Sequence, residues 1–145
     1  MKKLLKKTIC VSFISFCLLK IDQIQSLVPY YYLPTQKNLN RESLSIGKTA
    51  YQLLYFGQYE QSLNLAKLAV QINKNDEKLW LILSEAQVAN ELYKNALFSL
   101  NKAQKINPKN SEVYFAKSNL YLKLSKLENA KTALETALRI EPNNH

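Results

Sequence analysis

Three consecutive residues, Gly47-Lys48-Thr49, have the order that ends a phosphate-binding loop and so are the first candidate for chemistry in this chain. Such a loop needs a second glycine five residues before Gly47, and the chain has Glu42 there. The segment also has helical spacing, whereas the loop follows a strand. We therefore attribute the match to chance and expect no nucleotide cofactor.

The other residue types that perform catalysis are too few or too scattered to form a site. His145 is the only histidine, so a His-based nucleophile relay or histidine metal site cannot be built. The acidic residues occupy isolated positions where we expect solvent, and no spacing pairs them in a pocket. These residues are Glu60, Glu85, Glu91, Glu128 and Glu135. The sequence predicts no catalytic residue, no metal site and no enzyme.

The elements that position these residues follow a repeat with a fixed period of about 34 residues. Apolar, small and proline residues recur at this interval, as do two tyrosines. The pairs are Ala96 and Ala130, Leu100 and Leu134, Ala103 and Ala137, Ile106 and Ile140, Pro108 and Pro142, Ala69 and Ala103, and Tyr59 and Tyr93. A fixed period of this length predicts stacked helical repeats, in which each unit leaves an apolar face for its neighbour to cover.

Each repeat is predicted to contain two helices. Ala96, Leu100 and Ala103 form one apolar stripe at helical spacing. Pro108 and Pro142 cannot continue a helix, and they mark sharp ends. At the next helix starts, Asp76-Glu77 and Ser111-Glu112 supply acceptors and negative charge. We expect first helices over residues 43–56, 77–90 and 111–124, and second helices over 58–72, 92–106 and 126–140.

The residues at these periodic positions resemble the tetratricopeptide repeat (TPR), over residues 43–144. The matching positions are Ile46, Ala50, Gly57, Tyr59, Ser62, Ala66 and Ala69; then Trp80, Ser84, Tyr93, Ala96, Leu100, Ala103 and Pro108; then Tyr114, Ser118, Tyr121, Ala130, Leu134, Ala137 and Pro142. Departures are Lys74 in place of proline, Lys117 in place of an apolar residue, and Glu91 and Ser125 where the turn favours glycine. The resemblance implies an all-α, right-handed superhelical solenoid of three TPR hairpins, over residues 43–76, 77–110 and 111–144.

In TPR domains the first helices line a concave groove that binds peptides or helices. Carried over by position, the groove would consist of Gly47, Tyr51, Leu54, Tyr55, Leu81, Glu85, Val88, Ala89, Phe115, Asn119, Leu122 and Lys123. This set lacks the Lys, Asn and Arg clamp of the chaperone-binding TPR proteins. It implies an apolar or amphipathic protein segment as the partner. The alternative is that Leu81, Val88 and Leu122 pack within the hairpins, or that the segment before the repeats covers the groove.

Residues 1–26 have the layout of a secretory signal: four lysines, an apolar stretch over residues 8–19, then polar residues. The apolar stretch spans about 18 Å as a helix, against roughly 30 Å of membrane hydrocarbon. Cleaved signal, uncleaved membrane anchor and a helix packed on the domain remain three alternatives. Cys10 and Cys17 lie inside the apolar stretch and are interpreted as part of it. The lysines predict a cytoplasmic start, which places the repeats across a membrane in a periplasm-like or lumenal space.

Residues 27–42 are predicted to be a linker or cap rich in proline and tyrosine. Pro29 and Pro34 prevent a helix between them, and Tyr30, Tyr31 and Tyr32 lie in the same stretch. These tyrosines either cover the first hairpin or lie at a membrane interface.

The net charge of +9 does not indicate a nucleic-acid site, because the lysines lie mainly on outer faces and no basic–aromatic platform is present. The function predicted is a protein–protein interaction scaffold or assembly factor, membrane-associated or exported. The alternative is a tethered helper subunit of an envelope enzyme or secretion complex. A narrower resemblance is to TPR proteins of cyanobacteria and algal plastids, some of which assist photosystem assembly. The third repeat ends on an apolar face, which predicts a homodimer contact or further repeats.

Overall fold

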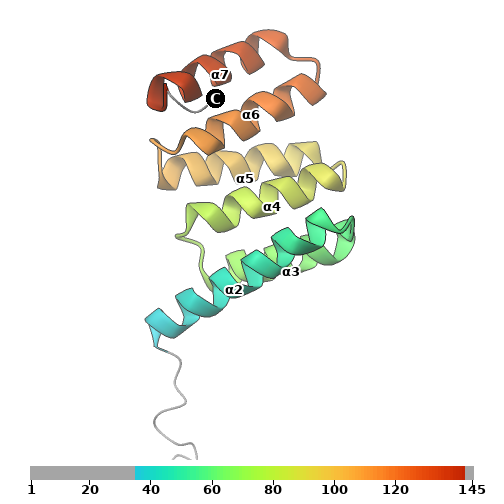
Figure 1. The fold of residues 1–145 in the computed structure, drawn as a ribbon, viewed down its shortest axis with the longest axis vertical. Coiled ribbons are helices and arrows are strands. Elements are labelled where there is room, and N and C mark those ends of the chain that lie inside the picture. Colours follow the sequence, from blue (N-terminus) through green and yellow to red (C-terminus); the bar gives the residue numbers. More distant parts are fainter. Residues whose placement is uncertain (1–34, 143–145) are drawn as a thin grey trace, which may run out of the picture. The chain divides into compact units, whose positions relative to one another are not determined.

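The computed structural model describes residues 35–142, which form a stack of helices in chain order (Figure 1). The helices are α2 (Gln36–Tyr55), α3 (Tyr59–Ile72), α4 (Glu77–Ala89), α5 (Tyr93–Ile106), α6 (Ser111–Lys123) and α7 (Leu127–Ile140). Residues 1–34 and 143–145 lie outside the described part. The predicted signal or anchor, Cys10, Cys17, the tyrosine run and His145 therefore lie outside it too.

The helix bounds agree with the expected hairpins to within one or two residues, except at the start of α2. This helix begins at Gln36, whereas the sequence predicted a start at residue 43. Pro29 and Pro34 disfavour a helix only up to residue 34, and residues 36–42 contain no helix-breaking residue. The expected start of the first helix was therefore seven residues too late, since residues 36–42 are helical.

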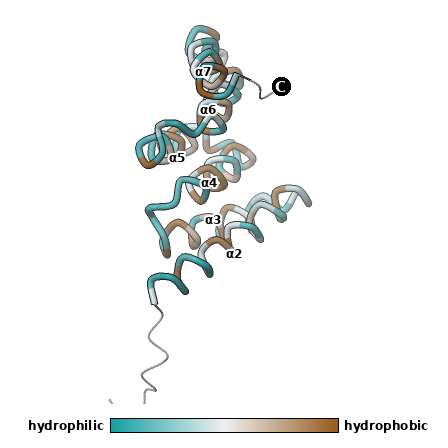
Figure 2. Tube along the Cα trace, turned by 60° about the vertical axis from the view of Figure 1, so that its left-hand side comes forward, coloured by the Kyte–Doolittle hydropathy of each residue, from teal (hydrophilic) through white to brown (hydrophobic). Residues whose placement is uncertain are grey.

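Each helix packs against the next helix, and each first helix also contacts the first helix of the following repeat. The hairpins α2–α3, α4–α5 and α6–α7 thus form a stack in which α4 lies between α2 and α6 (Figure 1). Along each helix the hydropathy alternates, as expected when one face is buried and the other is solvated (Figure 2). The result is a layer of first helices beside a layer of second helices.

Small residues form the closest contacts between helices. Ala50, Ala66, Ala96 and Ala103 are fully buried, which agrees with their periodic positions. Gly47 is also buried, and a Cβ atom there would lie 2.6 Å from Cδ2 of Leu79. A larger side chain at these sites would force the helices apart. Gly47 therefore belongs to the α2–α4 contact and not to a binding surface.

The starts of α4 and α6 have equivalent caps. The Asp76 carboxylate accepts a hydrogen bond of 2.9 Å from the backbone N–H of Lys78, and the Asn110 side chain accepts one of 3.0 Å from Glu112. The sequence had placed Ser111 in this role, one residue too late. The hydroxyl of Ser111 instead donates to the Glu141 carboxylate. Caps of this kind satisfy backbone donors that have no partner within the helix.

The three turns inside the hairpins share a left-handed backbone at equivalent positions of the repeat. The φ angles are 74° at Gly57, 60° at Glu91 and 56° at Ser125. The left-handed region costs a residue with a Cβ about 1–2 kcal/mol. Glu91 and Ser125 therefore adopt the glycine conformation of the turn without being glycine.

Lys117 departs from the repeat pattern and is nevertheless buried, with 8% of its surface exposed. Its ammonium group donates a hydrogen bond to Oε1 of Gln104, and Nε2 of Gln104 donates to the Tyr114 hydroxyl at 3.2 Å. Burial lowers the pKa of Lys117 below its ordinary value of 10.5. A polar contact between α5 and α6 thus replaces the apolar one expected here.

Candidate functional site

The first helices of all three hairpins line a cleft of about 460 Å³, which we call the groove cleft. Its lining residues are Tyr51 of α2; Lys78, Leu81, Ile82 and Glu85 of α4; and Glu112, Phe115, Ala116 and Asn119 of α6. Tyr51, Glu85 and Asn119 are one repeat period apart, so equivalent positions of three successive repeats face one space. The stacking of the first helices builds this cleft.

A second cleft, also of about 460 Å³, is lined mainly by α4 and α6, with further residues from α3 and α5 and from the α4–α5 turn. We call it the turn cleft, and it shares Glu85, Ala116 and Asn119 with the groove cleft. Its other lining residues are Tyr59, Ser84, Val88, Ala89, Glu91, Tyr93, Leu100, Leu120 and Lys123. Glu85 and Asn119 therefore border both spaces.

Most of the groove residues expected from the sequence lie together. Five of them line the groove cleft: Tyr51, Leu81, Glu85, Phe115 and Asn119. Val88, Ala89 and Lys123 line the turn cleft. The alternative of packing within the hairpins also holds in part, because Leu81 is buried in the core of the second hairpin and Val88 packs against that core.

The structure places Leu54, Tyr55 and Leu122 outside both clefts. Leu54 packs against the core of the first hairpin. Tyr55 is 85% exposed, with its ring edge-on to Phe56 at a centroid distance of 5.5 Å. Leu122 is 52% exposed on α6. These three positions were assigned by pattern alone, and a small rotation of a helix moves its border residues out of a groove.

The electrostatics of the groove centre on Glu85. Burial raises the pKa of the Glu85 carboxyl above its ordinary value of 4.5, and the nearby charge of Glu112 raises it further. Within residues 35–142, Glu85 makes no hydrogen bond or ion pair with another residue. Sequence reasoning missed Glu112 as a groove residue, because its place in the first turn of α6 already explained it.

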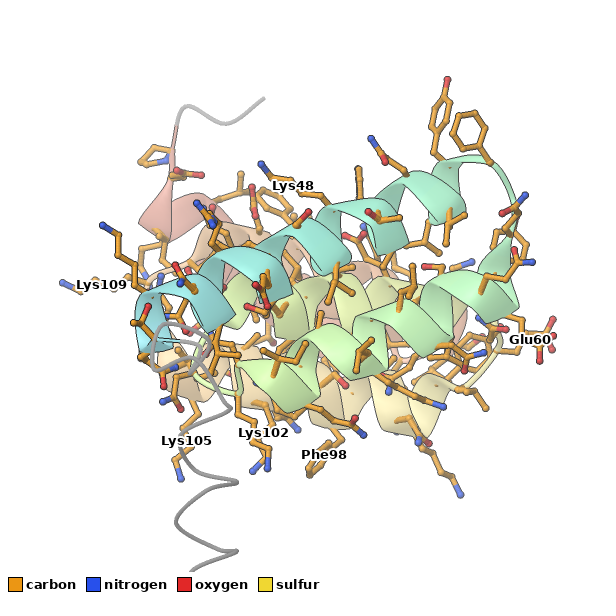
Figure 3. The ribbon with its side chains drawn as sticks, turned by 90° about the horizontal axis from the view of Figure 1, so that it is seen from below. Lys48, Glu60, Phe98, Lys102, Lys105 and Lys109 are labelled. Carbon is orange, nitrogen blue, oxygen red and sulfur yellow. The ribbon has the colours of Figure 1, made fainter. Side chains whose placement is uncertain are left out.

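The opposite side of the stack carries basic and aromatic residues of α5. The Lys102 ammonium lies 5.2 Å from the centre of the Phe98 ring, which meets Trp80 edge-on at 6.3 Å. Figure 3 shows Phe98, Lys102 and Lys105 pointing outward on this side, away from Lys48 on α2. These lysines are remote from the groove cleft and do not neutralise its carboxylates.

A further cavity of about 320 Å³ lies between α6 and α7. It is lined by Tyr114, Lys117, Tyr121, Glu128, Asn129, Thr132, Ala133 and Thr136. Thr132, one of these lining residues, occupies the position of Phe98 one repeat earlier. The outer face of α7 also exposes Leu127, Leu134 and Leu138.

None of the helices in residues 35–142 combines the length and the apolar character needed to cross a membrane. The predicted membrane segment lies outside these residues.

The hairpins and their periodic contacts define a helical-repeat protein. Residues 77–110 and 111–144 each match the family model described as the tetratricopeptide repeat. These two units are TPR repeats, and residues 35–142 have the all-α TPR superhelical fold.

Solved structures show the same fold. The second TPR domain of Spaghetti (RPAP3), bound to the HSP90 peptide SRMEEVD, is 20% identical with a TM-score of 0.67, covering 73% of this chain and 97% of that one. The Arabidopsis OM64 TPR domain is 19% identical with a TM-score of 0.68, covering 73% and 88%. The Yersinia enterocolitica type III secretion chaperone SycD, in complex with a peptide of the translocator YopD, is 19% identical with a TM-score of 0.64, covering 69% and 76%. No curated protein sequence matches this chain.

Proposed function

We propose that this chain is a non-enzymatic interaction scaffold that holds an apolar or amphipathic segment of a partner protein in the groove cleft, and that it acts in the assembly of a complex. The observation that carries the proposal is the convergence of Tyr51, Glu85 and Asn119 from three successive repeats on one cleft, beside Leu81 and Phe115. A continuous surface of this kind suits an extended or helical segment laid across several repeats.

The peptide complexes of Spaghetti (RPAP3) and SycD support this use of the fold. The groove of this chain differs from a clamp for acidic peptide ends, because its central polar residues are a carboxylate and an amide. We therefore propose a partner segment recognised mainly through apolar contacts.

A paired substitution tests the proposal. Tyr51→Ser with Phe115→Ser removes two aromatic walls of the groove cleft, while Phe98→Ser removes an exposed aromatic residue from the opposite side. Affinity purification of the native chain should recover a partner that the groove variant loses and the control keeps. Equal recovery with both variants, each checked for helix content by circular dichroism, would reject the groove as the binding surface.

We also propose that residues 1–26 place the module at or across a membrane, on the support of their charged and apolar layout alone. Cell fractionation with and without these residues tests this. Co-migration of the native protein with pigment–protein complexes would support an assembly role at a photosynthetic membrane. Recovery with an envelope enzyme would reject that role in favour of a helper subunit.

A homodimer through the third repeat is a further proposal, supported by the exposed leucines of α7. A structure of SycD, which has the same fold, is described as an alternative dimer. Light scattering after size-exclusion chromatography should show a dimer that Leu134→Ser with Leu138→Ser converts to a monomer. A monomer in both cases would remove this contact from consideration.

A further inference from the structure

We propose that the partner segment carries a lysine or arginine flanked by apolar residues, and that Glu85 and Glu112 bind the charged end of that side chain. This inference rests on the proposed function and specifies the chemistry of the partner. It makes the groove of this chain a receptor for a positive charge.

The position of Glu85 is the first argument. The residue is half-buried at the middle of three equivalent groove positions, between Tyr51 and Asn119, and it borders both clefts. A carboxylate that is partly removed from water and lacks a protein partner is costly, and an incoming cation offsets that cost. Glu85 has no such partner among the described residues.

Glu112 supplies a second carboxylate on the facing helix, in the same cleft. Burial raises the pKa of Glu85, and repulsion between the two negative charges raises it further. The protein's own cations in the clefts, Lys78 and Lys123, are exposed, and within residues 35–142 neither forms an ion pair with these carboxylates. The carboxylates of Glu85 and Glu112 therefore have no ion-pair partner among the described residues, and a cation from a partner would stabilise them.

The walls of the groove cleft fit the rest of such a side chain. Tyr51 and Phe115 present aromatic rings, which attract an ammonium or guanidinium group. Leu81, Ile82 and Ala116 give an apolar surface for the methylene stem of a lysine or arginine. An acidic segment would instead add a further negative charge beside Glu85 and Glu112 and be repelled by them.

Selection of random short peptides on the immobilised full chain tests the inference. Wild type should enrich peptides with one lysine or arginine between apolar residues. The Glu85→Gln, Glu112→Gln double variant should enrich apolar peptides without a basic preference. Glu60→Gln is the matched control, since Glu60 is exposed and points outward near the α2–α3 turn (Figure 3), and it should select as wild type does.

Affinity measurements then give the size of the effect. A labelled peptide from the selection should bind about tenfold more weakly when its basic residue is replaced by glutamine, as expected for loss of one close charge pair. Glu85→Gln should produce a similar loss for the basic peptide and none for the glutamine peptide. Fluorescence anisotropy provides the readout, and the loss should shrink at high salt.

The outcomes separate the inference from the proposed function. Apolar peptides that bind wild type and the double variant alike would overturn the charge recognition and leave the groove function standing. Peptides that bind equally to the Tyr51→Ser, Phe115→Ser variant, or no enrichment at all, would overturn both. A synthetic peptide of residues 1–20, itself basic and apolar, serves as a competitor. Because its lysines stand beside apolar residues, this peptide should displace the selected one, and a version with its lysines replaced by glutamine should displace it more weakly; equal displacement by both versions would overturn the charge recognition.

Discussion

The indole Nε1 of Trp80 donates a hydrogen bond of 2.8 Å to the carbonyl oxygen of Lys74. One repeat later, the hydroxyl of Tyr114 donates to the carbonyl oxygen of Pro108 at 2.9 Å. Each bond ties the first helix of a repeat to the end of the repeat before it. Trp80 also packs against the cores of the first and second hairpins. This residue is therefore the main junction between them.

Replacing Trp80 should uncouple these hairpins. Trp80→Phe removes the hydrogen bond and should cost about 1 kcal/mol of unfolding free energy. Trp80→Ala also removes the packed ring and should cost about 3 kcal/mol. Urea unfolding followed by circular dichroism measures both. Phe98→Ala, at an exposed ring, should cost much less, and equal costs would contradict the assigned role of Trp80.

Glycine should be the most stable residue at all three left-handed turn positions. Gly57→Ala should destabilise the fold by about 1 kcal/mol through backbone strain alone, because no atom lies within 4 Å of the added Cβ. Glu91→Gly and Ser125→Gly should each stabilise it by about 0.5 kcal/mol, the relieved strain less the entropy that glycine adds to the unfolded chain. Thermal unfolding of the single variants checks the signs. A stabilising Gly57→Ala would show that the turn tolerates a Cβ without strain.

Lys117→Leu should stabilise the protein at neutral pH. Leucine occupies the equivalent site one repeat earlier, at Leu83, and the substitution removes a desolvated ammonium. The gain should be about 1 kcal/mol, or about 4 °C in Tm. Because the folded pKa lies below 10.5, the free energy of unfolding of the wild type rises as pH increases from the lowered pKa toward 10.5. The stability advantage of Lys117→Leu over the wild type should therefore shrink over this pH range. Lys131→Leu, at an exposed site on α7, should show no such pH dependence.

The ionised carboxylate of Glu85 should lower the free energy of unfolding at neutral pH. Its pKa is raised in the folded state, by burial first and by Glu112 second, so the folded protein binds the proton more tightly than the unfolded chain. Stability should therefore fall as pH rises from 4.5 through the raised pKa. Glu85→Gln should raise Tm at pH 7, with a gain that vanishes below pH 4.5. A gain that stays constant with pH, or an equal gain in Glu60→Gln, would contradict this origin.

The helices could be predicted because the same small and apolar residues recur at each contact in successive repeats. Helix α5, for example, could be predicted from the spacing of Ala96 and Ala103, and its end from Pro108. The early start of α2 at Gln36 escaped prediction because residues 36–42 lack both the repeat pattern and a helix breaker. The hydrogen bond from Lys117 to Gln104 could not be predicted either, because it depends on how α5 packs against α6.

The groove was predictable where position in the repeat decides which way a side chain points. Tyr51, Glu85 and Asn119 share one repeat position and face one cleft. Leu54 and Leu122 also share a position, yet one packs in the core and the other is exposed. Border positions of this kind depend on the rotation of each helix, which the sequence period does not encode. The pairing of Glu85 with Glu112 likewise required the observed approach of α4 and α6.

Every helix in the stack touches only the next helix or the one after it. Nearly all the energy that holds a residue therefore comes from chain close to it in sequence, as in a one-dimensional array. Such an array unfolds locally from its terminal repeats, while its central repeat stays folded. Hydrogen exchange should accordingly be slowest in α4 and α5 and faster in α2 and α7. Because α2, α4 and α6 all line the groove cleft, opening of either outer hairpin would remove part of its wall and leave only the α4 residues around Glu85 in place.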